Sequence, residues 1–441
     1  MLEEGILCMN VLLLPWGSDG DVNPHIGLGV ALRARGHRVV VVANERFSSC
    51  VCRTGLDFVP LGTTEDYRAA IQDPEQAKAG LLGSFRAWRV LKRTFMKEMR
   101  PQYQIIADRY IAGRTVLCAS PLAIGARIAH IKLHIPMATL YSTPAVYRSA
   151  YKPPAGASGL VLPEWSPRLL NRAFFLLGDT VGGRLPTGPI KDFCADLGIA
   201  PTRRLTRVLW HAPQRDIALF PEWFCPRQAD WPTQTRLTEF PLYDRADTEK
   251  FPVEAREFVG TGDAPLVFTT CMGAGQGARF FDVAAEACLR LERRGLLVSP
   301  ASIESARSVS DRIRFFTYLP YGTLLPRGAV LVHSGGIGTS AQAMAAGIPQ
   351  LVVPVVYDQT NNAVLLKRLG VGEWIRPSAF RTEIVVAKLR YLLESSAVAE
   401  QCRRIAGMFK GVDPFRRTCE LLEELEGTDT TSAPTVSTLT E

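Results

Sequence analysis

The chain has 441 residues, of which 47% are hydrophobic, so it is long enough for two or three domains with sizeable cores. Its net charge is +8, but the basic residues are scattered and form no block typical of a nucleic-acid-binding arm, so no nucleic-acid partner is expected. The ten cysteines contain no CxxC pair, and neither a run of 18 apolar residues nor a signal peptide is recognisable, so a reduced, cytoplasmic protein is predicted.

The first elements predict the opening of a doubly wound α/β sheet. A continuous apolar run from Val11 to Pro15 is typical of a strand buried on both faces. A turn at 17–21 leads into a helix expected from Pro24 to Arg35, and buried strands are expected at 38–43 and 55–61. Strand, helix and strand in this order predict a parallel βαβ unit.

A long helix is predicted from Ala77 to Tyr110. Six basic residues are interspersed with its apolar ones, namely Arg86, Arg89, Lys92, Arg93, Lys97 and Arg100. A basic helix face of this kind is more often solvated surface, and peripheral contact with a membrane is the alternative.

The rest of the first half predicts strands at 115–119, 136–141 and 217–220, with a helix up to Ala129 between the first two. The strand at 217–220 is expected to be the last of this half. Residues 142–190 are rich in proline, glycine and aromatic residues and are expected to be irregular. Such an insertion on an α/β sheet is a place for a substrate pocket or lid, although a packing excursion explains it equally well.

The second half repeats the opening pattern of the first. The charged stretch 245–262 is interpreted as a linker, and a strand is expected at 265–270 after it. A turn at 271–275, a helix up to Arg294 and a strand at 295–299 follow.

The end of the chain predicts helices and a tail. Two helices follow Arg381, and a last helix ends at Glu426. Residues 427–441 are rich in Thr and Ser and poor in apolar residues, so a disordered tail is expected. The predicted domains are 1–244 and 245–426, each a doubly wound unit.

The most informative stretch begins at Val330 and reads VLVHSGGIGTSAQAMAAGIPQLVVPVVYDQTNNA. A short strand ending at His333 is expected to lead through a glycine turn at 334–339 into a small-residue helix at 340–346 and a second strand at 350–356. Glycines at a helix entry let a ligand approach bare backbone, and the unpaired N–H groups with the helix dipole favour an anion. The pattern therefore predicts a diphosphate cradle.

This stretch resembles the donor-binding signature of the GT-B glycosyltransferases, the family of plant secondary-product, bacterial antibiotic and sterol glycosyltransferases. The match from His333 to Gln359 is closer to the bacterial HxGGxGT form than to the plant HCGWNS form. The resemblance implies an α/β fold of the GT-B type, in which two doubly wound Rossmann-like domains face each other across a cleft. The first domain would bind the acceptor and the second the nucleotide sugar.

The resemblance also implies roles by position. The diphosphate would be held by His333, Gly335, Gly336, Gly338 and Thr339. Asp358 and Gln359 would bind the sugar hydroxyls, and the segment beginning Tyr318-Leu319 would contact the nucleotide base.

Two positions depart from the family pattern. Ala341 stands where the plant signature has a glutamate that grips the ribose. In the first turn of the second half, Cys271 and Met272 replace the usual Ser or Thr, so Thr270 or the Gly273 backbone would contact the phosphate instead.

The catalytic base is expected in the turn Gly20-Asp21-Val22-Asn23-Pro24-His25, which resembles the G-[HD]-x-x-P turn of the family. Asp21 occupies the position of the family's catalytic residue, although a carboxylate with its ordinary pKa of about 3.9 is a weak base. His25 is better tuned chemically and is kept as the alternative, but it lies inside the expected helix. Asp21 could also cap that helix.

A metal site is not predicted. Asp19-Gly20-Asp21 matches the D-x-D signature of the GT-A fold, but three-residue motifs are common by chance. The same turn does not match the G-x-G-x-x-G of dinucleotide-binding dehydrogenases. Backbone N–H groups and His333 would take the developing charge, so neither a metal nor another cofactor is expected.

The resemblance implies an inverting hexosyltransferase that uses a nucleotide sugar, most simply a UDP-hexose. Its acceptor would be a small, apolar, hydroxylated molecule such as a lipid, sterol or polyketide. The alternatives are a GT-B-fold epimerase of the nucleotide sugar and a catalytically silent relative that activates another transferase.

Overall fold

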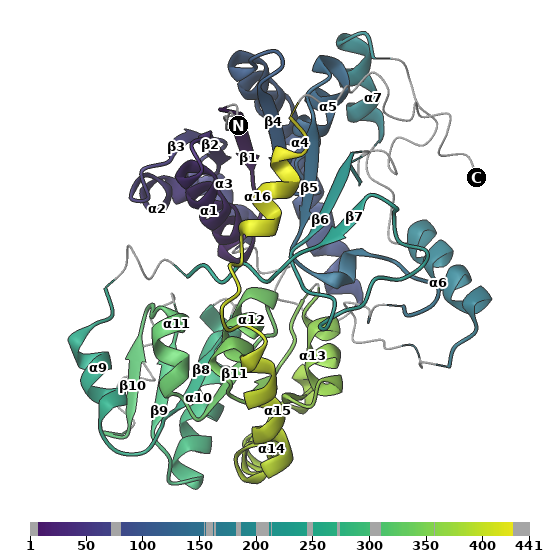
Figure 1. The fold of residues 1–441 in the computed structure, drawn as a ribbon. Coiled ribbons are helices and arrows are strands. Elements are labelled where there is room, and N and C mark those ends of the chain that lie inside the picture. Colours follow the sequence, from purple (N-terminus) through teal and green to yellow (C-terminus); the bar gives the residue numbers. More distant parts are fainter. Residues whose placement is uncertain are drawn as a thin grey trace, which may run out of the picture.

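The computed structural model describes residues 8–426, except for 72–80, 154, 156–161, 163–164, 182–186, 200–210, 213, 245–249, 271–273, 300–309 and 357. The described chain contains two parallel β-sheets, each covered by helices (Figure 1). The first sheet is formed within residues 10–237 and the second within 266–374. The two doubly wound halves expected from the sequence are confirmed.

The first half contains a seven-stranded parallel sheet in the order β3-β2-β1-β4-β5-β6-β7. Its strands are β1 (Asn10–Leu14), β2 (Arg38–Ala43), β3 (Asp57–Pro60), β4 (Thr115–Ala119), β5 (Met137–Tyr141), β6 (Arg215–Ala218) and β7 (Thr235–Leu237). Every residue of β1, β4 and β5 is buried, as expected for strands covered on both faces. The strand order reverses between β1 and β4, and ligands bind α/β sheets at the carboxyl ends beside such a reversal.

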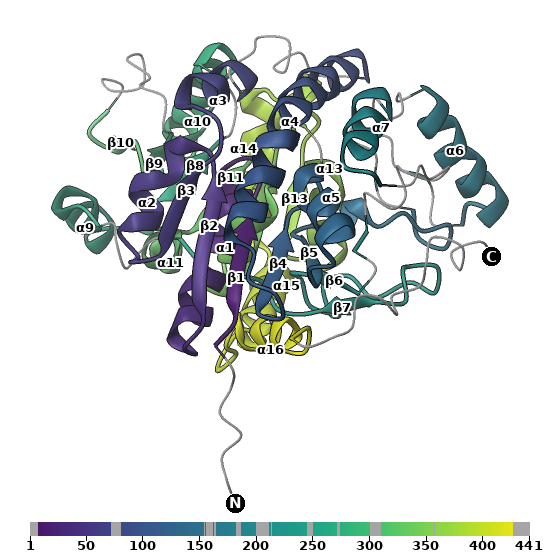
Figure 2. The same cartoon turned by 90° about the horizontal axis from the view of Figure 1, so that it is seen from above.

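Helices cover both faces of this sheet. They are α1 (Asp19–Ala34), α2 (Ser48–Cys52), α3 (Thr64–Ile71), α4 (Leu81–Arg109), α5 (Ile124–Leu133), α6 (Arg168–Val181) and α7 (Thr187–Asp196), with short 3-10 turns η1 (Glu45–Phe47) and η2 (Pro144–Val146). Val11 and Leu13 of β1 pack on the α1 side, whereas Leu12 and Leu14 pack on the α5 side. Helices α6 and α7 lie toward β6 and β7 and away from β3 (Figures 1 and 2).

The second half contains a six-stranded parallel sheet in the order β10-β9-β8-β11-β12-β13. Its strands are β8 (Leu266–Thr269), β9 (Gly295–Val298), β10 (Ile313–Phe316), β11 (Val330–His333), β12 (Gln350–Val352) and β13 (Gly372–Trp374). Its helices are α9 (Val253–Gly260), α10 (Ala274–Arg290), α11 (Tyr321–Leu324), α12 (Ile337–Ala346), α13 (Gln359–Arg368), α14 (Thr382–Glu394) and α15 (Ser396–Gly407), with 3-10 turns η4 (Leu325–Arg327) and η5 (Pro377–Ala379). The strand order again reverses, here between β8 and β11.

Several predicted elements differ from the structure. Residues 142–190 are not irregular throughout, because they contain α6 and the start of α7. The strand at 217–220 is not the last of its half, since β7 follows as a short edge strand. The expected linker at 245–262 contains α9, and the strand expected to reach Val356 ends at Val352, two residues before a proline that cannot donate a ladder hydrogen bond. The expected tail at 427–441 lies outside the described residues.

The last described helix, α16 (Arg416–Glu423), packs against the first half, although the predicted boundary assigns it to the second. Its buried residues Cys419, Leu421 and Leu422 join the apolar cluster that includes Val11 and Leu13 of β1. The approach to α1 is close, because a Cβ on Gly27 would lie 2.4 Å from the ring of Phe415. The chain therefore crosses back to its first half at the end, as Figure 1 shows in yellow.

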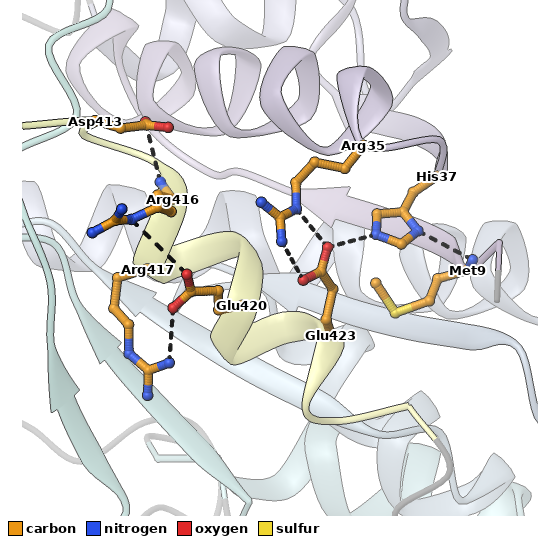
Figure 3. A network of polar contacts seen from close by, with 8 residues as sticks. All are labelled: Met9, Arg35, His37, Asp413, Arg416, Arg417, Glu420 and Glu423. Carbon is orange, nitrogen blue, oxygen red and sulfur yellow. Dashed lines mark hydrogen bonds and ion pairs between the residues drawn. The ribbon is translucent and has the colours of Figure 1, made fainter. Parts of the chain in front are cut away.

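A polar network fastens α16 to the first half (Figure 3). The Glu423 carboxylate accepts hydrogen bonds from both Nε and Nη2 of Arg35, at 2.6 and 2.7 Å. The buried His37 ring lies between Glu423, 2.9 Å from Nε2, and the Met9 backbone N–H, which donates to Nδ1 over 3.3 Å. Nδ1 is therefore the acceptor, and Nε2 carries the proton that is donated to Glu423.

The basic helix expected at 77–110 is confirmed as α4 over residues 81–109. Lys97 forms an ion pair with Asp66, and Arg100 pairs with Asp196 and lies over the Phe193 ring. The side chains of Arg86, Arg89, Lys92 and Arg93 lie outside the described part. Among the helices described, none is long and apolar enough to cross a membrane.

Candidate active site

The glycine turn joins the end of β11 to the start of α12, at the reversal of strand order in the second sheet. Gly335 has a φ of +92°, and a Cβ there would lie 2.7 Å from Cγ1 of Val352 and 3.0 Å from the carbonyl oxygen of Gln359. Both the backbone conformation and the close neighbours exclude a side chain. The turn is therefore tightly packed on its inner side.

The outer side of the same turn is open. Nothing lies within 4 Å of a Cβ built on Gly336 or Gly338, so the backbone there is not covered by side chains. Helix α12 begins at Ile337, three residues earlier than predicted, and Gly338 and Thr339 lie in its first turn. The unpaired N–H groups of a first helical turn favour an anion.

His333, the last residue of β11, is buried, and both of its ring nitrogens have protein partners. Nδ1 accepts a hydrogen bond from the Gly335 backbone N–H at 3.2 Å, so the ring proton lies on Nε2 and points to Oε1 of Gln350 at 3.0 Å. Burial lowers the pKa of His333 to about 4, so the ring is neutral. The ring holds the turn in place, and the expected direct bond from the ring to a diphosphate does not fit this arrangement.

Thr270 lies beside the turn at the end of the neighbouring strand β8. Its hydroxyl is 3.0 Å from that of Ser334, and both side chains are buried. The preceding Thr269 accepts a hydrogen bond from the hydroxyl of Tyr321 at 2.9 Å. Thr270 is thus placed next to the turn as predicted, whereas Gly273 lies outside the described residues.

The segment expected at the nucleotide base is fastened to the end of the first half. Tyr318 is partly exposed and donates its hydroxyl hydrogen bond to the backbone carbonyl of Asp244. The Asp244 carboxylate accepts a bond from the Gly322 N–H at 2.6 Å. Leu319 is buried in the apolar core, so only its backbone is suited to contact a ligand.

Asp358 and Gln359, the residues expected at the sugar, lie at the start of α13. Oε1 of Gln359 accepts hydrogen bonds from the backbone N–H groups of Val355 and Val356, at 2.7 and 3.0 Å, and so fixes the preceding loop. The Asp358 carboxylate accepts a bond from Nδ2 of Asn362 at 2.7 Å. Burial raises the pKa of Asp358, and the bond from Asn362 opposes that rise.

Asn362 is a site residue that the sequence did not reveal. It is fully buried, and besides Asp358 its Nδ2 donates to the backbone carbonyl of Gly335 at 2.9 Å. Its Oδ1 accepts a hydrogen bond from the hydroxyl of Thr143 at 3.2 Å. The only sequence signal was its position in the stretch that carries Asp358 and Gln359, since its partners come from distant segments.

Asp21 lies in the first turn of α1, at the carboxyl end of β1. The helix begins at Asp19, earlier than predicted, with Ser18 as N-cap residue. The Asp21 carboxylate accepts hydrogen bonds from the N–H of Ser18 at 2.8 Å and from its hydroxyl at 3.0 Å. Burial is the main reason that the pKa of Asp21 rises to about 6, and the nearby charges of Asp358 and Asp19 add to it.

His25, the alternative base, lies one helical turn beyond Asp21 on α1. Its Nδ1 is 2.9 Å from the Asp21 backbone carbonyl, an arrangement in which Nδ1 donates. Its Nε2 is buried and finds no hydrogen-bond partner in the described part of the chain. Burial lowers the pKa of His25 to about 4. The burial of His25 and its lowered pKa, beside the raised pKa of Asp21, therefore favour Asp21 over His25 as a proton acceptor for a ligand.

The two halves meet at these residues. Asp21 and Asp358, one from each half, lie close enough for their charges to interact. Hydrogen bonds from Thr143 to Asn362 at 3.2 Å and from the Ala155 N–H to Oδ1 of Asn361 at 3.0 Å also join the halves. The carboxyl-end loops of both sheets therefore form one composite site.

The D-x-D sequence does not form a paired carboxylate site. Asp19 forms an ion pair with Arg46 at 2.6 Å, while Asp21 bonds to Ser18. Within the described ranges, no cluster of three or more His, Cys, Asp or Glu side chains suited to a metal ion is found.

Comparison with known proteins agrees with this geometry. Residues 11–151 match the family model described as the glycosyltransferase family 28 N-terminal domain. Residues 296–411 match the model of the erythromycin biosynthesis protein CIII-like C-terminal domain. The chain is 28% identical to the O-mycaminosyltylonolide 6-deoxyallosyltransferase of Streptomyces fradiae, over 96% of this chain and 99% of that protein.

Solved structures share the fold. The calicheamicin glycosyltransferase CalG4 matches with a TM-score of 0.69 at 18% identity, covering 96% of this chain and 99% of that one. The glycosyltransferase VinC, solved in complex with dTDP, matches with a TM-score of 0.66 at 18% identity, covering 94% of this chain and 100% of that one. The arrangement of two facing doubly wound halves is thus the one these proteins have.

Proposed function

We propose that this chain, which belongs to the GT-B glycosyltransferases of the antibiotic and natural-product group, moves a hexose from a nucleotide sugar to a hydroxyl of an apolar acceptor, with inversion at the anomeric carbon. One observation carries the proposal. A carboxyl group whose pKa is raised to about 6, Asp21, lies on one half, within charge range of Asp358 on the other. Asp358 is tied through Asn362 to the open glycine turn.

The donor diphosphate is assigned to the outer side of that turn. The open backbone at Gly336 and Gly338 and the N-terminus of α12 support this assignment, as do the buried hydroxyls of Thr270 and Ser334 beside them. His333 acts here by holding the Gly335 N–H, not by touching the phosphates. The sugar is assigned to Asp358 and Gln359.

The nucleotide is a pyrimidine nucleoside diphosphate, either UDP or dTDP. The small, buried Ala341 offers no carboxylate to a ribose hydroxyl. This agrees with a donor whose sugar ring forms no hydrogen bond at this position. VinC, which shares the fold, was solved with dTDP. A dTDP-hexose is therefore tested beside the UDP-hexose suggested by the sequence.

The proposed reaction is a single displacement. The acceptor oxygen attacks the anomeric carbon while the bond from that carbon to the diphosphate oxygen breaks. Asp21 accepts the hydroxyl proton, and the negative charge that develops on the nucleoside diphosphate is stabilised by the backbone N–H groups of the glycine turn. No metal ion or other cofactor is assigned to any of these steps.

The acceptor is proposed to be a hydroxylated, mainly apolar natural product. The name of the Streptomyces fradiae relative describes transfer of a 6-deoxyallosyl group to O-mycaminosyltylonolide, which supports an acceptor and a deoxyhexose of this kind. Segment 142–190 of the first half is the proposed acceptor region, because Thr143 and Ala155 reach the donor half.

The test is a measurement of nucleoside diphosphate release from UDP- and dTDP-hexoses, with and without hydroxylated macrolide, polyketide and sterol acceptors. Acceptor-dependent release with a product of inverted anomeric configuration is expected. Acceptor-independent isomerisation of the nucleotide sugar would indicate an epimerase. Donor binding without any turnover would indicate a silent activator.

A further inference from the structure

At the junction of the two halves, both the nitrogen and the oxygen of the Asn362 side-chain amide form hydrogen bonds. The carbonyl oxygen of Gly335 can only accept a hydrogen bond, so the amide nitrogen must face it, 2.9 Å away. The same nitrogen lies 2.7 Å from Oδ2 of Asp358. The amide oxygen consequently faces Thr143, whose hydroxyl must be the donor over 3.2 Å.

Thr143 brings the acceptor half into this arrangement. It follows β5, at the carboxyl end of the first sheet, and precedes η2. Asn362, the side chain that holds the carboxylate proposed to bind the sugar, is therefore itself held by a side chain of the opposite half.

We propose that Thr143 and Asn362 are a pair of positioning residues that align Asp358 with the donor sugar only when the two halves are closed. If Asp358 binds the sugar as proposed above, the pair makes the sugar subsite depend on the acceptor half. Asn362 links the same alignment to the diphosphate turn through Gly335. Correct sugar placement and closure over the acceptor then become one event, which limits reaction of the donor with water.

Asn361 provides a matched control. It also joins the halves, through Oδ1 and the Ala155 N–H at 3.0 Å, and in the part of the chain that the structure describes it forms no hydrogen bond to Gly335 or Asp358. A general loosening of the contact between the halves should therefore appear equally in Asn361→Ala and Asn362→Ala. Loss of alignment should appear only in Asn362→Ala.

The test compares kcat, the affinity for nucleotide sugar and the affinity for free nucleoside diphosphate. Thr143→Val keeps the side-chain shape and removes the hydroxyl, so kcat and nucleotide-sugar affinity should each fall about tenfold, the effect of one lost hydrogen bond. Free UDP or dTDP should bind as before. Thr143→Ser keeps the hydroxyl and should restore both values.

Asn362→Ala should lower kcat by roughly 10²-fold, the scale of a small misplacement at a reacting centre. Adding Thr143→Val to Asn362→Ala should cost nothing more, because the pair is already broken.

The proposal for the pair is overturned if Thr143→Val keeps the kcat and the sugar affinity of the wild type, or if Asn361→Ala is as damaging as Asn362→Ala. Should Asn362→Ala fail to fold, Thr143→Val and Thr143→Ser decide alone. A wild-type protein that transfers no sugar counts against the proposed function instead. The comparison of nucleotide sugar with nucleoside diphosphate binding still tests the pair in that case.

Discussion

Asp21 and Asp358 belong to different halves of the chain, and the charge of Asp358 contributes to raising the pKa of Asp21 to about 6. Burial of Asp21 is the larger cause, and the Ser18 hydrogen bonds act against it. An isolated aspartate would be a poor base near neutral pH, since its reference pKa is about 3.9. Contact between the two halves thus helps to raise the pKa of the proposed base, Asp21.

The pH dependence of transfer should report this tuning. Asp21 can accept a proton only when ionised, so kcat/KM should fall as the pH drops through about 6 and level off above it. Rates measured from about pH 5 to about pH 9 with one donor and acceptor will locate the limb. Rates that stay level down to about pH 5 would show that the carboxyl keeps its ordinary pKa, near 4, in the working enzyme.

Asp21→Asn should reduce transfer by roughly 10²–10⁴-fold, because it removes the proton acceptor. A carboxyl whose pKa is raised on folding lowers stability as the pH rises above its unfolded-state value of about 3.9, and the loss is complete above about 6. The variant should therefore unfold at the same temperature as the wild type or higher near pH 7. Turnover and thermal unfolding are measured side by side. His25→Ala is the control and should slow transfer much less, although it leaves a space in α1. The reverse ranking would make His25 the base.

Asp358→Ala should impair transfer of the sugar far more than binding of the free nucleoside diphosphate. Its carboxylate lies at the start of α13, whereas the diphosphate is assigned to the turn before α12. Calorimetric titration with the nucleoside diphosphate and steady-state kinetics with the nucleotide sugar separate the two effects. Equal losses in both would place Asp358 at the diphosphate.

His333→Ala should weaken nucleoside diphosphate binding about tenfold although the ring does not face the ligand. The substitution removes the acceptor for the Gly335 N–H, so the turn loses one of the bonds that fix it. His333→Asn offers an oxygen close to the position of Nδ1 and should recover part of the affinity. Unchanged binding in His333→Ala would mean that the packing around Gly335 holds the turn without the ring.

Glu423→Ala should lower the free energy of unfolding by about 1–2 kcal/mol, because it removes the two-pronged contact with Arg35 and leaves the buried His37 without its partner. Arg35 is the main reason that the pKa of Glu423 is lowered, so this contribution is present above the ordinary glutamate pKa and is lost as the pH falls below it. Urea unfolding near pH 7 measures the difference.

Glu420→Ala is the matched control on the same helix. Glu420 pairs with Arg416 and Arg417 of α16 itself, at the exposed surface (Figure 3). Its loss should change stability by less than about 0.5 kcal/mol. Equal effects of the two substitutions would show that α16 is held by its apolar residues alone.

The sequence predicted elements wherever burial imposes a simple pattern. The apolar runs at β1 and β8 were recognised because parallel strands covered on both faces need them. The edge strand β7 was missed, because three residues with one buried side chain carry no such pattern. Helix α12 was placed three residues late, because glycines that suit a helix entry also suit a turn.

Some residues of the candidate site could likewise be predicted from the sequence, and others could not. The positions of Asp358 and the glycine turn followed from a contiguous stretch of sequence, and the structure places them together. The partners of Asn362 could not be foreseen, since Thr143 lies 219 residues away in the chain. Likewise, it could not be foreseen that both ring nitrogens of His333 bond within the protein, because Gln350 becomes its neighbour only when β11 and β12 pair.

The return of α16 to the first half has a consequence for how the protein is made and recombined. Synthesis proceeds from β1 onward, yet one apolar face of that sheet is completed by Leu421 and Leu422, near the end of the described chain. The first half therefore cannot finish burying its core on the ribosome before the second half has emerged. For the same reason, a hybrid enzyme with an exchanged donor half should keep the α16 that belongs to its own first half. The exchanged piece is then an internal segment and not the whole carboxyl-terminal part.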